Sequence, residues 1–437
     1  MLLIYTPKKT TRLTYIFDFI FKDILGVEFQ ISTDREEFGR NTSPKLNYSD
    51  APFSSEPFIY SSHLLSEKGI REQEISFNLW NDTPVLFYTH PRYEFPFDVF
   101  AASFYLITRY EEYLPHLRDE YDRYLPNTSI ASKKNFINKP VVDIWAYQLK
   151  NYLQKFFPDL KFSERKYRFI STIDIDNAYA YLEKGFMRTT GAFIRSLVKF
   201  ELSDFKDRLF SQLNLMHDPY DTYSFQLKLQ KKYNLKTIYF FLLGDYDLND
   251  KNVSASSFRF RSLIKYLADY AAVGIHPSFA SNSRPEKVRI EIQRLNKIVR
   301  RDIRNSRQHF LKLKFPHTYR TLIENDITDD YTMGYAHTTG FRAGTCTSFR
   351  FYDLDNEEIT SLNIHPFAVM DATLKYYLKL TPEESLPKIQ LLIDEVKRVN
   401  GTFTSLWHNE SLSEYKQWKG WKYIFEEMIK IAVPVRQ

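Results

Sequence analysis

Residues 167–177, YRFISTIDIDN, combine a short apolar run with two aspartates at its end. The run at 167–173 has the length and the β-branched and aromatic content of a buried strand. Asp174 and Asp176 are two residues apart, so their side chains share one face of an extended chain. Two carboxylates this close repel each other and separate their pKa values unless a cation lies beside them. The pair therefore suits one metal-binding carboxylate and one general base, and two aspartates that only cap the following turn are the alternative.

Short apolar runs alternate with amphipathic helices after this first strand. Further strands are expected at residues 237–243, 271–275, 309–313, near Phe341 and at 402–407. Two of the intervening helices have recognisable starts. Ser283 and Glu286 have the spacing of a capping box, and Thr381 begins a second one. The alternation predicts repeated β/α units, so the fold class is α/β.

The first 160 residues do not show this regular alternation of strands and helices. Three segments have the patterns of regular structure, a strand at 2–5 and helices at 13–24 and 142–157. Asp98 has the position of an N-cap, and Pro115 ends the apolar stripe that follows it. The segment 158–166 is short, charged and begins with proline, so we place a domain boundary there. The sequence predicts an N-terminal accessory α/β domain at 1–160 and a second domain at 167–437.

Composition places the chain among globular proteins. Its 437 residues and 52.2 kDa exceed what one hydrophobic core usually organises. Apolar residues make up 43% and the formal net charge is +6. This small excess, without a basic tail, does not indicate a nucleic-acid partner. The basic stretch 287–314 alternates with apolar residues at helical spacing, so we expect its charges on the solvent face of a helix, with an anion site as the alternative.

The N-terminus and the cysteine content bear on the compartment. The single cysteine, Cys346, permits no intramolecular disulfide and no cysteine metal cluster. Lys8, Lys9 and Arg12 follow the apolar start at once, so a secretory signal is not expected. No run of about 18 uncharged apolar residues occurs, which excludes a membrane span. We therefore expect a cytoplasmic protein, and nothing in the sequence specifies its oligomeric state.

Three of the ten histidines lie at ends of expected strands. His276 and His408 close their strands, as the two aspartates close theirs, whereas His309 opens the strand expected at 309–313. The carboxyl ends of parallel strands meet at one edge, where active sites form. Aspartate and histidine are ligands that zinc and similar divalent ions take in hydrolytic sites. The sequence therefore predicts a metal site, although a lone histidine is more often structural.

Other enzyme classes lack their motifs. The sequence contains neither the Gly-x-Ser-x-Gly elbow of serine hydrolases nor the glycine-rich loops that bind nucleotides. No base beside Cys346 is evident, as a cysteine nucleophile requires. A glycosidase that uses Asp174 and Asp330 as its two carboxylates stays open on residue types, but it leaves the histidines unexplained.

Five motifs follow one another in the second part of the chain: Thr172-x-Asp174-x-Asp176, Gly274-x-His276-Pro-Ser, Arg307-x-His309, Asp329-Asp330-Tyr331 with Gly340-Phe-Arg342-Ala-Gly344, and Leu406-x-His408. Their order resembles the polysaccharide deacetylase family of metal-dependent carbohydrate esterases. The resemblance covers roughly residue 167 to the C-terminus, and the N-terminal part is similar to an accessory region of a bacterial subgroup. It implies an irregular (β/α)7-type barrel, one divalent metal ion, zinc foremost, and hydrolysis of an N-acetyl group on a sugar or glycan.

The resemblance also gives a role to each strand-end residue. Asp174 matches the general base and Asp176 the metal-binding carboxylate. His276 matches the first metal histidine, His408 the histidine that protonates the leaving amine, and Arg307 the arginine that orients the base.

The chain departs from the family pattern at one ligand. The second metal histidine of the family lies four positions after the first, and that position is Ala280 here. His309, two residues after Arg307, is the expected substitute. Asp330 matches the supporting acid of the family's fourth motif. Loss of a ligand also fits a descendant that binds glycans without turnover, which is the alternative function.

Arg342 completes the set of candidate residues. We expect its guanidinium to hold an acidic group or a substrate oxygen through two hydrogen bonds, or to form a salt bridge to a helix acid. A cytoplasmic deacetylase meets biosynthetic intermediates, which carry phosphates. We therefore expect a phosphate-linked or short N-acetylated precursor, contacted by Arg342 or by the basic residues Arg300, Arg301 and Arg304.

Overall fold

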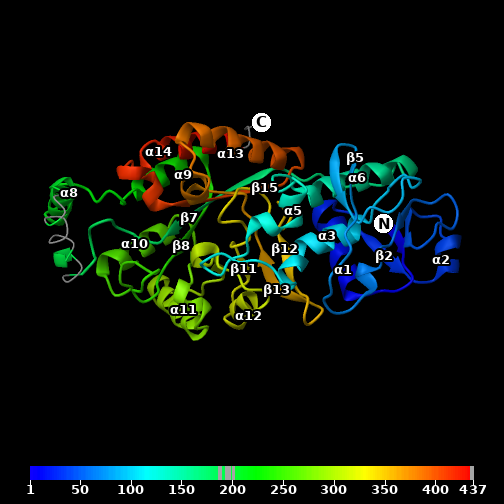
Figure 1. Cartoon of the computed structure of the whole chain (residues 1–437), viewed down its shortest axis with the longest axis horizontal. Helices are drawn as coiled ribbons and strands as arrows, with labels where there is room; N and C mark the ends of the chain where they lie inside the picture. Colours follow the sequence, from blue (N-terminus) through cyan, green and yellow to red (C-terminus); the bar gives the residue numbers. More distant parts are fainter. Residues whose placement is uncertain (186–188, 192–197, 199–201, 434–437) are drawn as a thin grey trace.

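A row of nine hydrogen-bonded strands organises the second part of the chain (Figure 1). The computed structural model describes residues 1–185, 189–191, 198 and 202–433. The strand order is β12-β13-β11-β10-β9-β8-β7-β15-β14, and all neighbours are parallel except β12 and β13. The strands are β7 (Arg168–Ile175), β8 (Lys236–Phe241), β9 (Ala272–Ile275), β10 (Asn305–Ser306), β11 (Asp329–Asp330), β12 (Phe349–Asp353), β13 (Glu358–Ile364), β14 (Val369–Met370) and β15 (Thr402–His408).

The register of these strands brings the expected site residues to one level. His408 at the end of β15 pairs with Asp174 of β7. On the other side of β7, Ser306 of β10 pairs with Ile275 of β9 and with Asp330 of β11. The carboxyl ends of neighbouring parallel strands therefore lie side by side, and the residues that follow them share one edge.

The predicted α/β class is confirmed, but the predicted barrel is not. Among the described strands, β12 and β14 are the two ends of the row, and no pairing joins them into a closed sheet.

Two of the expected strands are wrong. Residues 309–313 do not form a strand, because Phe310 and Leu311 have left-handed φ values of 59° and 56°. They belong to a 3-10 turn, His309–Leu311, so His309 follows its strand instead of opening it. Phe341 lies in a loop, since Gly340 and Gly344 on either side of it have φ values of 124° and 65°.

Helices flank the large sheet on both sides (Figure 1). The helix α13 packs on β15 and on α14, whereas α10 and α11 pack on β9. The helices are α8 (Leu202–Gln212), α9 (Tyr223–Tyr233), α10 (Phe258–Ala268), α11 (Glu286–Val299), α12 (His317–Glu324), α13 (Pro382–Arg398) and α14 (Trp421–Ala432). None of the helices in the described part of the chain is both long and apolar enough to cross a membrane.

One of the two predicted capping boxes is correct. Thr381 and Glu384 form a capping box at the start of α13. The capping box expected at Ser283 is wrong, because α11 begins directly after Pro285 and its first turn has no side-chain cap. Ser283 instead ends a short 3-10 turn, Phe279–Asn282.

The first part of the chain forms a second, smaller parallel sheet with the order β2-β1-β3-β4. Its strands are β1 (Leu2–Tyr5), β2 (Phe29–Ser32), β3 (Lys45–Ser49) and β4 (Phe58–Tyr60), and a separate hairpin joins β5 (Phe77–Trp80) and β6 (Thr83–Leu86). The helices of this part are α1 (Thr11–Phe17), which continues as a π-helix (Asp18–Ile24), α2 (Arg35–Arg40), α3 (Val99–Ile107), α4 (Tyr110–Tyr113), α5 (Ile130–Lys133) and α6 (Val141–Phe156). Asp98 caps α3, as predicted, by accepting hydrogen bonds from the backbone of Phe100 and Ala101.

Buried ion pairs connect the two parts of the chain. Arg342 donates to the two carboxylate oxygens of Glu112 at 2.9 and 2.6 Å. Arg109 donates to the same carboxylate at 2.8 Å. Arg12 pairs with Glu357 in the loop between β12 and β13. The largest hydrophobic cluster also contains residues from both parts, and the domain boundary at 158–166 stays a prediction.

Cys346 lies in the interior, 3% exposed. Burial raises the pKa of its thiol well above the ordinary value. A side chain at Gly401 would meet its sulfur, because a Cβ built there lies 2.2 Å from Sγ. The thiol is therefore enclosed by packed atoms.

Candidate metal centre

Five side chains meet at the carboxyl edge of the large sheet. Asp174 and Asp176 come from the end of β7, His276 follows β9, His309 follows β10 and His408 ends β15. All five line one cavity. The parallel register makes this possible, because side chains far apart in the sequence follow neighbouring strands.

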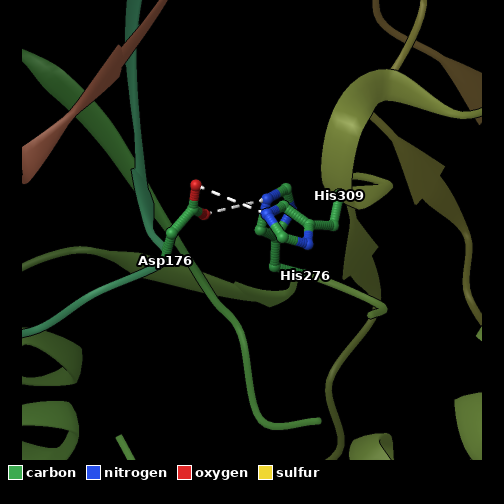
Figure 2. Close-up of side chains that lie close together, drawn as sticks. All are labelled: Asp176, His276 and His309. Carbon is green, nitrogen blue, oxygen red and sulfur yellow. Dashed lines mark ion pairs between the residues drawn. The ribbon is translucent and has the colours of Figure 1, made fainter. Parts of the chain in front are cut away.

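Asp176, His276 and His309 could hold a metal ion, because one ligand atom of each lies within 4.8 Å of the others. In Figure 2 the two imidazole rings face the carboxylate of Asp176. Nε2 of His276 lies 3.2 Å from Oδ1 of Asp176, and Nε2 of His309 lies 3.5 Å from Oδ2. Oδ1 is buried and accepts no hydrogen bond within the described residues. A buried carboxylate oxygen in this state is costly unless an ion satisfies it, so the residues fit a divalent cation.

The other nitrogen of each ring is held by a neighbour. Nδ1 of His276 lies 2.5 Å from the carbonyl oxygen of Arg307, which can only accept a hydrogen bond. Nδ1 of His309 lies 2.8 Å from Oδ1 of Asp250. Both Nδ1 atoms therefore donate, and in the neutral ring the lone pair of Nε2 points toward Asp176. Such outer partners fix the tautomer of metal-binding histidines.

The carboxylates and histidines of this cluster shift one another's pKa values. Burial of His309 disfavours its charged form, but Asp176 and Asp250 outweigh it and raise the pKa to about 9. Burial disfavours the Asp176 carboxylate as well, but the histidines His309, His276 and His408 outweigh it and lower its pKa well below the ordinary value. The site thus holds an ionised carboxylate that attracts positive charge.

Asp174 lies beside the ligand cluster and is fixed by an arginine. Nη1 of Arg307 donates to Oδ1 of Asp174 at 2.9 Å and to the hydroxyl of Thr172 at 2.7 Å. Nε of Arg307 donates to the carbonyl of Tyr331 at 3.0 Å. Oδ2 of Asp174 lies 3.7 Å from Nε2 of His276. One carboxylate oxygen is therefore held, and the other faces the cluster.

His408 completes the cluster from the opposite side. Its Nδ1 lies 2.8 Å from Oδ1 of Asp371, and its backbone N–H donates to Oδ2 of the same residue at 2.8 Å. Nε2 lies 3.7 Å from Oδ2 of Asp176. Burial disfavours the imidazolium, but Asp371 outweighs it and raises the pKa of His408 well above its ordinary value. His408 is therefore arranged to carry a proton at Nε2.

The cavity has a volume of about 330 Å³, within the range of small-molecule sites. Its polar floor is the cluster described above, and its wall is apolar and aromatic. The wall residues are Phe310, Leu311, Met370, Ala372, Tyr376, Tyr377, Leu406 and Trp418. Arg123 of the N-terminal part and Glu410 also line the cavity.

Three predicted site residues lie outside the cavity lining. Arg307 is one of them, and it contacts the site through its hydrogen bond to Asp174. Asp330 is fully buried and accepts hydrogen bonds from the backbone and hydroxyl of Thr332 at 2.9 and 2.8 Å. Burial raises its pKa to about 6. Arg342 forms a salt bridge with Glu112. Of the two roles expected for Arg342, the salt bridge to a helix acid is therefore the one that the structure has.

The basic residues that were expected to receive a substrate phosphate do not line the cavity, and the phosphate-linked substrate itself stays a prediction. Arg342 is buried against Glu112, so it has no free donor fork for a ligand. Arg300, Arg301 and Arg304 precede β10, and the cluster lies beyond the opposite end of that strand. They are therefore at the far edge of the sheet.

Three carboxylates of the site were not predicted from the sequence. Asp371 directly follows β14. An aspartate at the end of a strand indicates a site residue, but this strand has only two residues and was not predicted. Asp250 lies in a long loop after β8 without a motif. Glu410 is two residues after His408, and burial raises its pKa to about 7.

One family model matches the chain, and the match lies in the first part. Residues 2–158 match a family described as "Family of unknown function (DUF7033)". No curated protein matches the chain.

Several solved structures have limited similarity to the chain. A protein assigned as a polysaccharide deacetylase from Mycobacterium smegmatis has a TM-score of 0.39 and 12% identity, over 61% of this chain and 84% of its own. A polysaccharide deacetylase from Bacillus cereus has a TM-score of 0.30 and 10% identity, over 61% and 88%. A CE4 family pseudoenzyme from Bacillus anthracis has a TM-score of 0.26 and 10% identity, over 61% of both chains. Scores of this size leave the function to be argued from the site.

Proposed function

We propose that this chain is a metal-dependent hydrolase that removes an N-acetyl group from a sugar or glycan. The observation that carries the proposal is the convergence of three ligand-type side chains, a fixed carboxylate and a carboxylate-paired histidine on one cavity. These are the parts that hydrolysis of an amide requires: a cation, a base and an acid.

Asp176, His276 and His309 are the residues that would hold the metal ion. The ligand set of one carboxylate and two imidazoles suits zinc, which is the proposed ion. When bound, such an ion polarises the amide and acidifies a water molecule toward a pKa of about 7.

Asp174 is the proposed general base. Arg307 holds Oδ1 by a hydrogen bond at 2.9 Å, so the carboxylate cannot rotate freely. Oδ2 faces the cluster and can accept a proton from a water molecule there. Holding one oxygen while leaving the other available is how a carboxylate keeps its geometry during proton transfer.

His408 is the proposed general acid. The carboxylate of Asp371 stabilises the imidazolium, so Nε2 keeps a proton to give to the leaving nitrogen. The acid and the base come from paired positions on β15 and β7, where His408 lies opposite Asp174. The reacting carbon of a bound amide would lie between them.

The proposed substrate class follows from the cavity and from the resemblance of the motifs to carbohydrate deacetylases. Tyr376, Tyr377 and Trp418 give the wall an aromatic face on which a sugar ring can stack. The volume of about 330 Å³ accommodates a small ring with its acyl group.

The variant Asp174→Asn tests the proposal, because it removes the base without removing a proposed ligand. We expect the purified variant to bind metal as the wild type does and to release acetate from N-acetylated sugars about 10²–10⁴-fold more slowly. Metal content by elemental analysis and acetate release are the two measurements.

The opposite outcomes separate the alternatives. A wild-type chain that binds metal and sugar but releases no acetate is the glycan-binding protein without turnover. Unchanged acetate release by Asp174→Asn would show that Asp174 is structural. A wild-type chain that neither binds added zinc nor gains thermal stability from it would overturn the metal site.

A further inference from the structure

A loop of the N-terminal part reaches the candidate metal centre. Residues 118–124 fold back on themselves, and their ends pair as an isolated antiparallel bridge. We call residues 118–124 the hairpin loop. Its Arg123 lines the cavity beside His309 and Phe310. The cavity is therefore built from both parts of the chain.

The turn that carries His309 has an unfavourable backbone. Phe310 has φ 59° and ψ 8°, and Leu311 has φ 56°. Residues with a Cβ disfavour this left-handed region, and two in succession persist only where the surroundings hold them. The position of the His309 ring therefore depends on what holds the turn.

Arg123 holds this turn through its backbone. Nη1 donates to the carbonyl oxygen of Phe310 at 3.1 Å. Nη2 donates to the hydroxyl of Tyr377 at 2.9 Å, and Nε donates to Asp119 at 2.7 Å. The side chains of Arg123 and Asp119 are only 5% and 7% exposed. All three guanidinium nitrogens are bonded within the protein, so Arg123 is arranged to position the turn and not to bind substrate.

Aromatic packing joins the same two segments. The ring of Tyr121 in the hairpin loop lies 4.9 Å from the ring of Phe310. Phe310 in turn lies 4.7 Å from the ring of His309 and 5.2 Å from that of Phe279. The turn is therefore held by a hydrogen bond and by ring contacts from one loop.

The absence of a histidine at position 280 makes the support of the His309 turn important for the proposed metal site. Ala280 stands where the resemblance places the second metal histidine, and its backbone N–H donates to Asp250 at 3.1 Å. Asp250 also holds Nδ1 of His309. The proposed third ligand therefore lies on the strained turn after β10 and not in the segment after β9, and there it needs external support.

We propose that the hairpin loop positions His309 as the third metal ligand, with Arg123 acting through the carbonyl of Phe310. This inference rests on the proposed metal site and gives the N-terminal part a role in it. Arg123 is a positioning residue, because it touches the ligand-bearing turn and no ligand atom.

The test is metal affinity, measured on the full chain by competition between the protein and a chromogenic chelator for Zn²⁺. We expect Arg123→Ala to raise the dissociation constant about 10–100-fold, as loss of an outer-shell partner does. Arg123→Lys keeps the charge but lacks the three-nitrogen fork, so it should also weaken binding. Arg118→Ala is the matched control in the same loop, because the one ion pair of Arg118 among the described residues is with Asp122 on the surface, at 3.0 Å.

A spectrum separates loss of the ligand from general damage. The cobalt-loaded His309→Ala variant gives the absorption of the site without its third ligand, and Arg123→Ala should move the wild-type spectrum toward it. If Arg123→Ala does not fold, Arg123→Lys decides the question by the same two measurements.

Each result has a definite meaning. Weaker zinc binding and the shifted cobalt spectrum in the Arg123 variants, with Arg118→Ala unchanged, support the proposal. Wild-type affinity and spectrum in a folded Arg123 variant overturn it while leaving the proposed function in place. A wild-type chain that binds no zinc overturns both.

Discussion

The carboxylate of Glu112 is enclosed by two arginines, Arg109 and Arg342. Burial alone would raise its pKa, but Arg342 and Arg109 outweigh burial and lower it from 4.5 to about 2. A carboxyl whose pKa is lower in the folded state stabilises the fold above its unfolded pKa and loses this contribution as the pH falls toward the folded value. Glu112 therefore links stability to pH between about 4.5 and about 2.

We expect Glu112→Gln to lower the free energy of unfolding at pH 7 by about 3–5 kcal/mol, because it leaves buried guanidinium groups without their counter-charge. The loss of stability on going from pH 7 to pH 3 should be smaller in the variant than in the wild type. Denaturant unfolding at the two pH values measures both quantities. Glu36→Gln is the control, since Glu36 pairs with Arg40 on the surface, and an equal pH dependence of Glu112→Gln and wild type would contradict the assignment.

The residues of the site differ in how readable they are from the sequence. Asp174, Asp176, His276 and His408 lie at strand ends in short motifs, and the structure brings all four to one cavity. Asp250 has no local signal, because its partner His309 is 59 positions away and only the fold joins them. The sequence suggests a salt bridge for Arg342 but does not identify Glu112 as its partner, because a salt bridge across 230 positions depends on tertiary packing.

Helices, strands and turns also differ in whether local or distant residues determine them. The helix start at Asp98 and the capping box at Thr381 depend on residues within one turn, and both are present. The short strands β10, β11 and β14 have two residues each and no periodic pattern, so only their neighbours in the sheet define them. The turn at Phe310 is apolar and reads as a strand, but contacts from the N-terminal part hold it in a left-handed conformation.

The strand β9 depends on a glycine at its closest approach to its neighbours. A Cβ built at Gly274 would lie 2.6 Å from the ring of Phe240 on β8 and 2.8 Å from the carbonyl oxygen of Asn305 on β10. The backbone oxygen cannot move without shifting the strand. We expect Gly274→Ala to lower the unfolding free energy by about 1–3 kcal/mol through overpacking, and to weaken zinc binding because His276 is two residues away.

Thermal melts and zinc titration of Gly274→Ala check this expectation. Gly39→Ala is the matched control, because a Cβ at Gly39 in the helix α2 meets no atom within 4 Å. That substitution should be neutral or stabilising, by up to about 1 kcal/mol. A Gly274→Ala variant as stable as the Gly39→Ala variant would show that β9 has room to adjust.

At the scale of the whole molecule, the two parts of the chain bury surface against each other. The largest hydrophobic cluster includes residues from Leu2 to Ala432, and Glu112, Arg12 and Asp143 of the first part bond to residues beyond 340. A linker with few contacts usually separates domains that fold alone. Here the linker separates two sheets that share buried contacts.

We expect the fragment 167–437 to be insoluble or unfolded when expressed alone, because it would expose apolar surface and lose the partners of Arg342 and Glu357. Co-expression with residues 1–166 should recover a soluble complex that binds zinc. Size-exclusion chromatography and circular dichroism of the two preparations provide the measurement. A soluble, folded fragment with wild-type zinc affinity would speak against a structural role of the first part.

The burial of Cys346 makes the chain a clean background for site-directed labelling. Because its one thiol is enclosed and held in the protonated form, maleimide reagents will leave it unmodified in the native state. A single cysteine introduced on the hairpin loop will then carry the only fluorophore or spin label. The mobility of that label, with and without added zinc, reports directly whether the N-terminal part responds to the proposed ion.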